Sequence, residues 1–251
     1  MVANFIALFK KESMVYLNSF ILYATSTIFL LLCGYFFFTD VIRFDTFLIN
    51  QRISITEGLF RQFFMDMDHV ICLTIPLLTM RLFSEEKKSG TIELLLTYPV
   101  RDMEIILAKF VSCVCVYTLM LSLTAIYPYL LSTIWDIEVA PVLSGYLGLF
   151  LIGCSCISLG LLISSFNKDQ IVAAMVTFGI MLLFLSVAFS AGWAGPVGQD
   201  ILIHLSFLEH SDRFARGIID TRSVVHCIIF TACFILFTYE SLRSRLWRGI
   251  R

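Results

Sequence analysis

Charged side chains are scarce in this chain, and their scarcity identifies its solvent. Only 15% of the 251 residues are charged, whereas 59% are hydrophobic, and the mean hydropathy is +0.88. Soluble domains carry about 25% charged and about 45–50% apolar residues. So large an apolar excess cannot be hidden inside one core, so most of the surface must face lipid. The net charge of −1 also argues against a nucleic-acid partner.

Motifs for catalysis, metal binding and nucleotide binding are also missing from the sequence. It contains no Gly-x-x-x-x-Gly-Lys-Ser/Thr phosphate loop, so any ATP must be bound by a partner chain. It contains no Gly-x-Ser-x-Gly elbow and no His-x-x-x-His pair. All eight cysteines lie in apolar runs, and the close pairs Cys113/Cys115 and Cys154/Cys156 would point about 200° apart on a helix. We therefore expect a non-catalytic chain with buried thiols, no metal, no cofactor and no disulfide framework.

Long hydrophobic runs predict an all-α membrane protein with six transmembrane helices. The predicted spans cover about 20–38, 63–83, 107–131, 142–164, 171–190 and 223–241. Together they predict a single transmembrane domain over residues 1–251. The second span reaches sufficient length only by including Asp66, Asp68 and His69. We interpret Asp66 and Asp68 as a hydrated helix end, in preference to a paired acid site or proton relay, because residues two apart on a helix diverge.

Lysine and arginine are divided unequally between the two sides that six spans define. The termini with the second and fourth loops hold 12 of the 18, and the other loops hold 6. The positive-inside rule then places both termini in the cytoplasm. Residues 1–18 alternate apolar side chains with Lys10, Lys11 and Glu12, which predicts an amphipathic interfacial helix. The half-apolar stretch 191–223 is expected to be a partly re-entrant external segment before span six.

Prolines and glycines inside the spans have two readings each. Pro76 and Pro128 would kink the second and third spans, and mark either a mobile pathway or ordinary packing kinks. The fourth span carries small residues whose spacing we interpret as one close-packing helical face. These are Gly145, Gly148, Gly153 and Gly160. We favour packing within the subunit over a dimer face.

A charged segment, residues 85–99, separates the second and third spans on the cytoplasmic side. Gly90 can cap a helix there, with Glu93 three residues further on reaching back to the cap N–H. Pro99 would end that helix after about two turns. Two turns are too few to be stable alone, so the segment must pack on something. A helix lying on the lipid surface is the alternative reading.

At this segment the chain resembles the ABC-2 type permease family, and within it a subgroup of gliding-motility and copper-oxidase-maturation permeases. The resemblance rests on Arg81 followed by Glu86, Gly90, Thr91, Glu93, Leu95, Leu96, Pro99 and Val100. The stretch Phe214–Arg222 also resembles the subgroup's turn before the last span. The second span, with Asp66 and Asp68, departs from the family pattern.

The resemblance implies a coupling helix that docks into a cytosolic ABC ATPase subunit. The residues it assigns to coupling are Glu85, Glu86, Gly90, Thr91, Glu93, Leu94 and Pro99. It further implies two ATPase copies, a second permease copy or paralogue, an accessory external or membrane-anchored subunit, and the bacterial cytoplasmic (inner) membrane. We expect an ATP-driven export permease, with a membrane-embedded lipid-modifying enzyme or a regulated channel as the alternatives.

Overall fold

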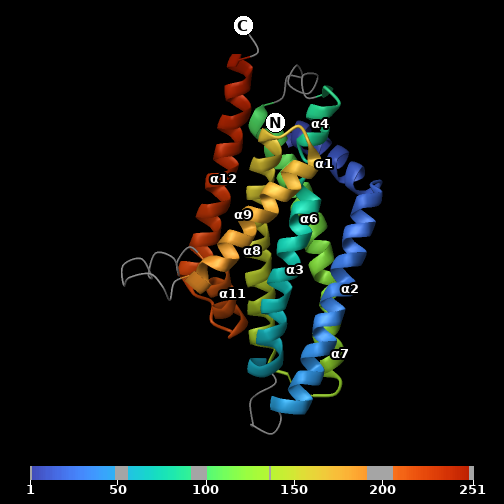
Figure 1. The fold of residues 1–251 in the computed structure, drawn as a ribbon. Helices are drawn as coiled ribbons and strands as arrows, with labels where there is room; N and C mark the ends of the chain where they lie inside the picture. Colours follow the sequence, from blue (N-terminus) through green and yellow to red (C-terminus); the bar gives the residue numbers. More distant parts are fainter. Residues whose placement is uncertain (1, 49–55, 92–100, 136, 191–205, 249–251) are drawn as a thin grey trace.

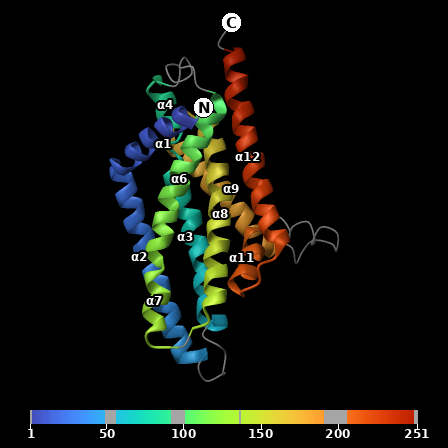
Figure 2. The ribbon, with the colours of Figure 1, turned by 180° about the vertical axis from the view of Figure 1, so that it is seen from behind.

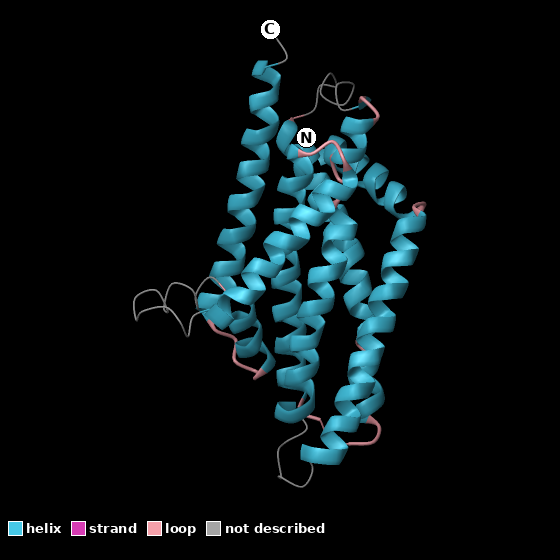
Figure 3. Cartoon of the chain, in the orientation of Figure 1, coloured by secondary structure: helices cyan, strands magenta, loops and turns pink. Residues whose placement is uncertain are grey.

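Helices make up nearly all of the computed structural model, which describes residues 2–48, 56–91, 101–135, 137–190 and 206–248 (Figure 3). Within these ranges there is no strand, so the predicted all-α class is confirmed. The helices are α1 (Val2–Leu17), α2 (Phe20–Arg43), α3 (Arg61–Thr79), α4 (Ser84–Lys88), α6 (Asp102–Thr124), α7 (Ile126–Ser132), α8 (Val139–Phe166), α9 (Gln170–Ser190), α11 (Phe207–Ala215) and α12 (Thr221–Arg248). Two π-helical turns, η1 (Phe44–Leu48) and η3 (Thr56–Phe60), lie between α2 and α3.

Six helical stretches of the described chain are long and apolar enough to cross a membrane, as predicted. They are Phe20–Thr46, Gly58–Lys88, Asp102–Ser132, Val139–Phe166, Gln170–Val187 and Thr221–Arg243. The second stretch, which looked short in the sequence, is 31 residues long because η3 precedes α3 and α4 follows it. Figures 1 and 2 place α1, α4 and the end of α12 at one end of the bundle, and η1 and α7 at the other. Both termini therefore lie at the same end, as an even number of spans requires.

Helix α8 is the central helix of the bundle. In its most apolar window 72% of the residues are buried, against 22% in the corresponding windows of α2, α9 and α12. It contacts α3, α6, α9, α11 and α12. Burial is therefore highest in α8 and lowest in α2, α9 and α12. The latter helices turn large apolar side chains outward, as a lipid-facing surface requires, among them Leu31, Phe38, Met175, Leu183 and Phe237.

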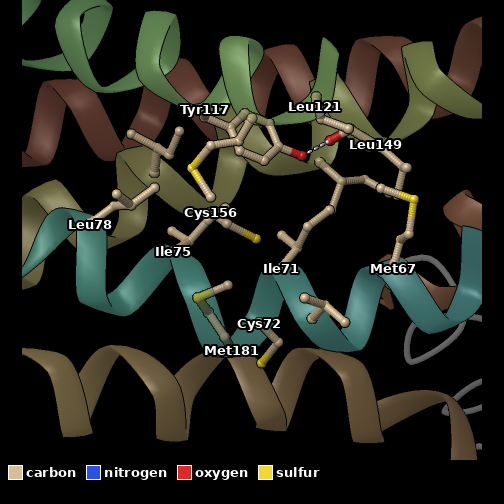
Figure 4. Close-up of a cluster of buried hydrophobic side chains, with 14 of the residues drawn as sticks. Met67, Ile71, Cys72, Ile75, Leu78, Tyr117, Leu121, Leu149, Cys156 and Met181 are labelled. Atoms are coloured by element: carbon tan, nitrogen blue, oxygen red, sulfur yellow. Dashed lines mark hydrogen bonds between the residues drawn. The ribbon is translucent and has the colours of Figure 1, made fainter. Parts of the chain in front are cut away.

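The core lies where α3, α6 and α8 meet, with α9 on the far side of α3 (Figure 4). Ile71 and Ile75 of α3 are buried there with Cys156 of α8 and Met181 of α9. The Tyr117 hydroxyl of α6 donates a hydrogen bond to the Leu149 carbonyl of α8 over 2.8 Å. That bond satisfies the buried phenol, since an unpaired hydroxyl in such surroundings is costly.

The small residues of α8 face three different helices, so their assignment to a single face was wrong. A Cβ at Gly145 or Gly160 would collide with Phe64 or Thr79 of α3, and one at Gly153 with Tyr117 of α6. At Gly148 it would collide with Phe214 of α11. Each glycine lets one neighbour approach the backbone of α8, which supports the favoured reading of packing within the subunit.

Pro128 coincides with a break in the third span. Helix α6 ends at Thr124 and α7 begins at Ile126, four and two residues before this proline. A proline ring clashes with the carbonyl four residues earlier, which here belongs to Thr124. Pro76, by contrast, lies inside α3 without ending it. Two cysteines also depart from expectation, because Cys115 and Cys233 are exposed on the outer surface and not buried.

Candidate functional site: a charged junction around helix α4

Helix α4 occupies the charged segment after the second span, and α8 holds its beginning. The Ser164 hydroxyl of α8 accepts hydrogen bonds from the backbone N–H groups of Phe83 and Ser84, over 3.0 and 3.2 Å. N–H groups at a helix start have no partner within the helix, so this side chain caps α4 from across the bundle. The Lys87 ammonium, which is buried, donates to the carbonyl of Ser165. The five residues of α4 are thereby fixed to the end of the central helix.

A buried lysine joins α4 to two more helices. Lys109 of α6 donates to Glu86 of α4 over 2.8 Å and to Glu12 of α1 over 3.1 Å. Its side chain is 3% exposed, and those of Glu12 and Glu86 are 9% and 16% exposed. Lys11 adds a second cation 3.6 Å from Glu12. We call Glu12, Glu86 and Lys109 the junction triad.

Further hydrogen bonds hold α1 to its neighbours. The Tyr16 hydroxyl donates to the Leu78 carbonyl of α3 over 3.2 Å, and the Ser112 hydroxyl of α6 donates to the Phe9 carbonyl over 3.4 Å. Burial raises the pKa of Tyr16 well above its usual value, and the nearby Cys113, Glu12 and Glu85 raise it further. Tyr16 therefore stays a neutral donor at physiological pH, and α1 is held to α3, α4 and α6.

The structure describes four of the residues that were predicted to take part in coupling, and three of them lie on the outward side of the junction. Glu85, Gly90 and Thr91 are exposed, whereas Glu86 points into the triad. Gly90 has φ +72°, a left-handed conformation that few residues other than glycine adopt, directly after α4 ends. Its predicted role as the N-cap of a coupling helix concerns residues 92–99, which lie outside the described residues. Glu93, Leu94 and Pro99 lie outside the described residues.

A second polar cluster lies between α3, α11 and α12, and the sequence did not predict it. His210 of α11 lies 2.9 Å from the Ser223 hydroxyl and stacks on the ring of His226 at 4.5 Å. Ser211 of the same helix interacts with Asp68 of α3. Asp68 is only 3% exposed, so its reading as a hydrated helix end was wrong. The error arose because α11 packs back against α3.

This second cluster has no room for a substrate. The cavity beside Asp68 measures about 10 Å³ and is otherwise lined by apolar and sulfur-bearing side chains. That volume holds about one water molecule. Among the described residues no group of three His, Cys, Asp or Glu side chains is arranged to hold a metal. Asp66, by contrast, is only half-buried and accepts from Gln62 over 3.3 Å.

Ion pairs fasten α11 to the outer end of the bundle. Asp212 pairs with Arg61 at the start of α3 over 2.6 Å and with Arg216 over 2.7 Å. Arg213 pairs with Asp220 over 2.9 Å. The Asp220 carboxylate also accepts from the Arg222 backbone N–H, which is the main reason its pKa is lowered. The stretch 214–222, part of the resemblance above, thus forms a capped turn into α12.

Six apolar helices with a charged junction at one end define a multi-pass membrane protein. The family model described as ABC-2 family transporter protein matches residues 6–204, so the chain belongs to this family. It is therefore the membrane permease of an ABC transporter, and membership implies association with an ATPase subunit. The match does not extend to the gliding-motility and copper-oxidase subgroup. A search of curated proteins finds no match to the sequence.

The sequence identified the exposed part of the junction and missed its anchors. Lys109, Glu12 and Ser164 were not predicted as site residues. Lys109 and Glu12 are separated by 97 positions, and Phe83 and Ser164 by 81. The one available signal was that Lys109 follows the charged loop within the apolar third span. A lysine so placed must find an acidic partner or reach the interface.

Proposed function

We propose that the chain is the permease subunit of an ATP-driven exporter and that a cytosolic ATPase subunit grips it at α4 and the residues that follow. Two ATPase copies and two permease chains, identical or paralogous, would form the transporter, with the termini in the cytoplasm of a bacterial inner membrane. The observation that carries the proposal is the anchoring of α4 to three helices. Because α4 is fixed to its neighbours while some of its charged side chains are exposed, the ATPase could bind these side chains and transmit motion to the spans.

The junction triad supplies a route for that force. A displacement of α4 would move Lys109 through Glu86, and α6 with it, over a contact of 2.8 Å. It would also move the end of α8 through Ser164. Because α8 contacts most of the bundle, motion at one cytoplasmic helix would spread to the other spans. The sequence-based expectation was transmission through spans two and three, and the contacts of Ser164 and Glu12 add α8 and α1.

An embedded lipid-modifying enzyme is the rival from another class, and the polar cluster around Asp68 and His210 is its strongest support. Both side chains are 3% exposed and the neighbouring cavity measures about 10 Å³. A substrate could not reach them without displacement of α11. The geometry therefore favours a packing role for this cluster.

Co-purification with the partner ABC ATPase subunit tests the proposal. Glu85→Lys reverses an exposed charge on α4, Glu93→Lys reverses one in the coupling segment, and Gly90→Val places a β-branched residue at a positive φ. We expect each variant to insert normally, to lose most of the bound ATPase and to abolish stimulated ATP hydrolysis in liposomes. Glu138→Lys, an exposed charge reversal at the opposite end, is the control. Unchanged ATPase binding by all three variants would contradict the proposal.

A further inference from the structure

A groove of about 600 Å³ opens beside the junction, between α1, the start of α2, the end of α3 and α4. Sites of about 300–1,000 Å³ accommodate small-molecule ligands. The helices α1 and α4 that border the groove lie together at one end of the bundle (Figure 1). Neither the coupling contact nor the core accounts for it.

The lining of the groove is amphiphilic. Its apolar part is formed by Leu22 of α2, Leu77 and Leu78 of α3, and Leu82. Its polar part is formed by Asn18, Ser19, Arg81, Ser89 and the charged residues considered below. An occupant must therefore have an apolar body and a polar end.

The groove opens toward side chains that themselves require lipid. Val15 is 54% exposed and Phe20 is 82% exposed, and both line it. Leu17, between them on the chain, is 52% exposed. Exposed apolar side chains beside a transmembrane helix start are stable only against acyl chains. A lipid molecule can therefore enter the groove sideways from the membrane.

Arg81 lines the groove, and its side chain is 34% exposed, so part of its guanidinium can be reached by an occupant. Its Nη1 donates to the Ser19 hydroxyl over 3.2 Å, while its Nε is buried and donates no hydrogen bond. The nearest carboxylate contact of Nε, to Glu85, is 3.9 Å long. A guanidinium with a free N–H suits a phosphate, which it can bind through two parallel bonds.

The charges around the groove balance. Three bases, Lys11, Arg81 and Lys109, line it together with three acids, Glu12, Glu85 and Glu86. A lining with no net charge offers little to a net anion, and it complements a headgroup that carries one charge of each sign. We propose that the groove binds one glycerophospholipid with a zwitterionic ethanolamine headgroup. The phosphate lies at Arg81, the ammonium faces Glu85, and an acyl chain runs along Leu22 and Leu77.

Native mass spectrometry of the full-length chain tests this site. The protein is reconstituted in nanodiscs of equal parts phosphatidylethanolamine and phosphatidylglycerol, then released, and the retained lipid is identified by mass. We expect wild type to retain one phosphatidylethanolamine in preference to phosphatidylglycerol. Arg81→Gln should lower its occupancy about tenfold, the effect of losing a charge-assisted hydrogen bond. Arg222→Gln, at an exposed arginine at the start of α12, should leave it unchanged.

Two further variants make the result specific. Leu77→Trp narrows the apolar part without changing charge, and should also empty the site if Arg81→Gln proves unstable. Glu85→Gln gives the lining one excess positive charge, so retention should shift toward phosphatidylglycerol. If wild type, Arg81→Gln and Leu77→Trp retain equal amounts of phosphatidylethanolamine, the proposed site is overturned. A wild-type preference for phosphatidylglycerol would overturn the zwitterionic assignment.

Discussion

Lys109 and Glu86, which belong to different helices, are joined by an ion pair of 2.8 Å that is almost closed to solvent. The same ammonium lies 3.1 Å from Glu12, so one side chain connects α1, α4 and α6. Burying charges is costly, and the cost is offset only by close geometry such as this. The pair links the segment proposed to meet the ATPase to the spans.

Removing the cation from this junction should destabilise the protein. Lys109→Met leaves Glu86 without its cation and Glu12 with only the more exposed Lys11, and breaking a buried ion pair costs about 3–5 kcal/mol. We expect a lower thermal unfolding midpoint in detergent. Lys168→Met, at an exposed lysine, should leave the midpoint unchanged. A Lys109→Met midpoint equal to wild type would show that the triad contributes no stability.

Removing the side-chain cap at the start of α4 should lower stability less than removing Lys109, and only locally. Ser164→Ala removes the acceptor of two backbone N–H groups, which corresponds to about 1–2 kcal/mol for a lost cap. We expect faster hydrogen exchange at the amides of Phe83 and Ser84. Ser186→Ala is the matched control, because its hydroxyl is exposed and bonds only within its own helix. Equal exchange in both variants would argue against a capping role.

Packing against α8 can be tested with a pair of glycines. Gly153→Ala forces the new methyl group against the ring of Tyr117, whose hydroxyl is fixed on Leu149. Overpacking of this kind costs about 1–3 kcal/mol. Gly179→Ala, on α9, meets nothing within 4 Å and should be neutral or stabilising by up to about 1 kcal/mol. Unfolding midpoints in the reverse order would contradict the packing described here.

The transmembrane architecture could be predicted because lipid leaves the chain few choices. Each span needs about 20 apolar residues with every backbone group bonded internally, and such runs are visible in the sequence. The charged segment after the second span was visible for the related reason that charges such as Glu85 and Glu86 interrupt apolar runs. The anchors at Lys109 and Ser164 could not be predicted, because long-range pairing leaves no periodic signal.

Asp68 illustrates a different failure. The sequence analysis correctly expected Asp66 and Asp68 to point in different directions on their helix. Asp66 is half-buried, whereas Asp68 is 3% exposed. The surroundings of Asp68 were predicted wrongly, because a position near the end of a span does not tell whether another helix covers that residue. Helix α11 follows the fifth span and packs back against α3. Its amphipathic sequence predicts that one face is buried, but does not tell which helix that face contacts.

Replacing Asp68 should therefore raise stability. Its carboxylate oxygens are buried with no partner in close hydrogen-bond geometry, Ser211 being the side chain that interacts with them, and an unsatisfied buried polar group costs about 1–3 kcal/mol. Asp68→Leu removes that cost and keeps the branched shape and the number of heavy atoms of the side chain, so the unfolding midpoint should increase. Asp66→Leu should not increase it, because that side chain is half-buried and already accepts from Gln62. A lower midpoint for Asp68→Leu would mean that the carboxylate has a partner that outweighs its burial.

The sidedness of the bundle can be tested by single cysteines in a background without the eight native ones. Lys88 at the end of α4 and Glu138 before α8 are both exposed and belong to opposite ends of the bundle. Lys87 would be a poor reporter, because it is buried against Ser165. The excess of lysine and arginine in the loops on the α4 side predicts that this side is cytoplasmic. A membrane-impermeant thiol reagent added to intact cells should therefore modify Glu138→Cys and not Lys88→Cys, and should modify both after the membrane is opened.

Labelling of both variants in intact cells would contradict the six-span topology. Labelling of Lys88→Cys alone would reverse its orientation, and the ATPase would then have to dock at the opposite end of the bundle.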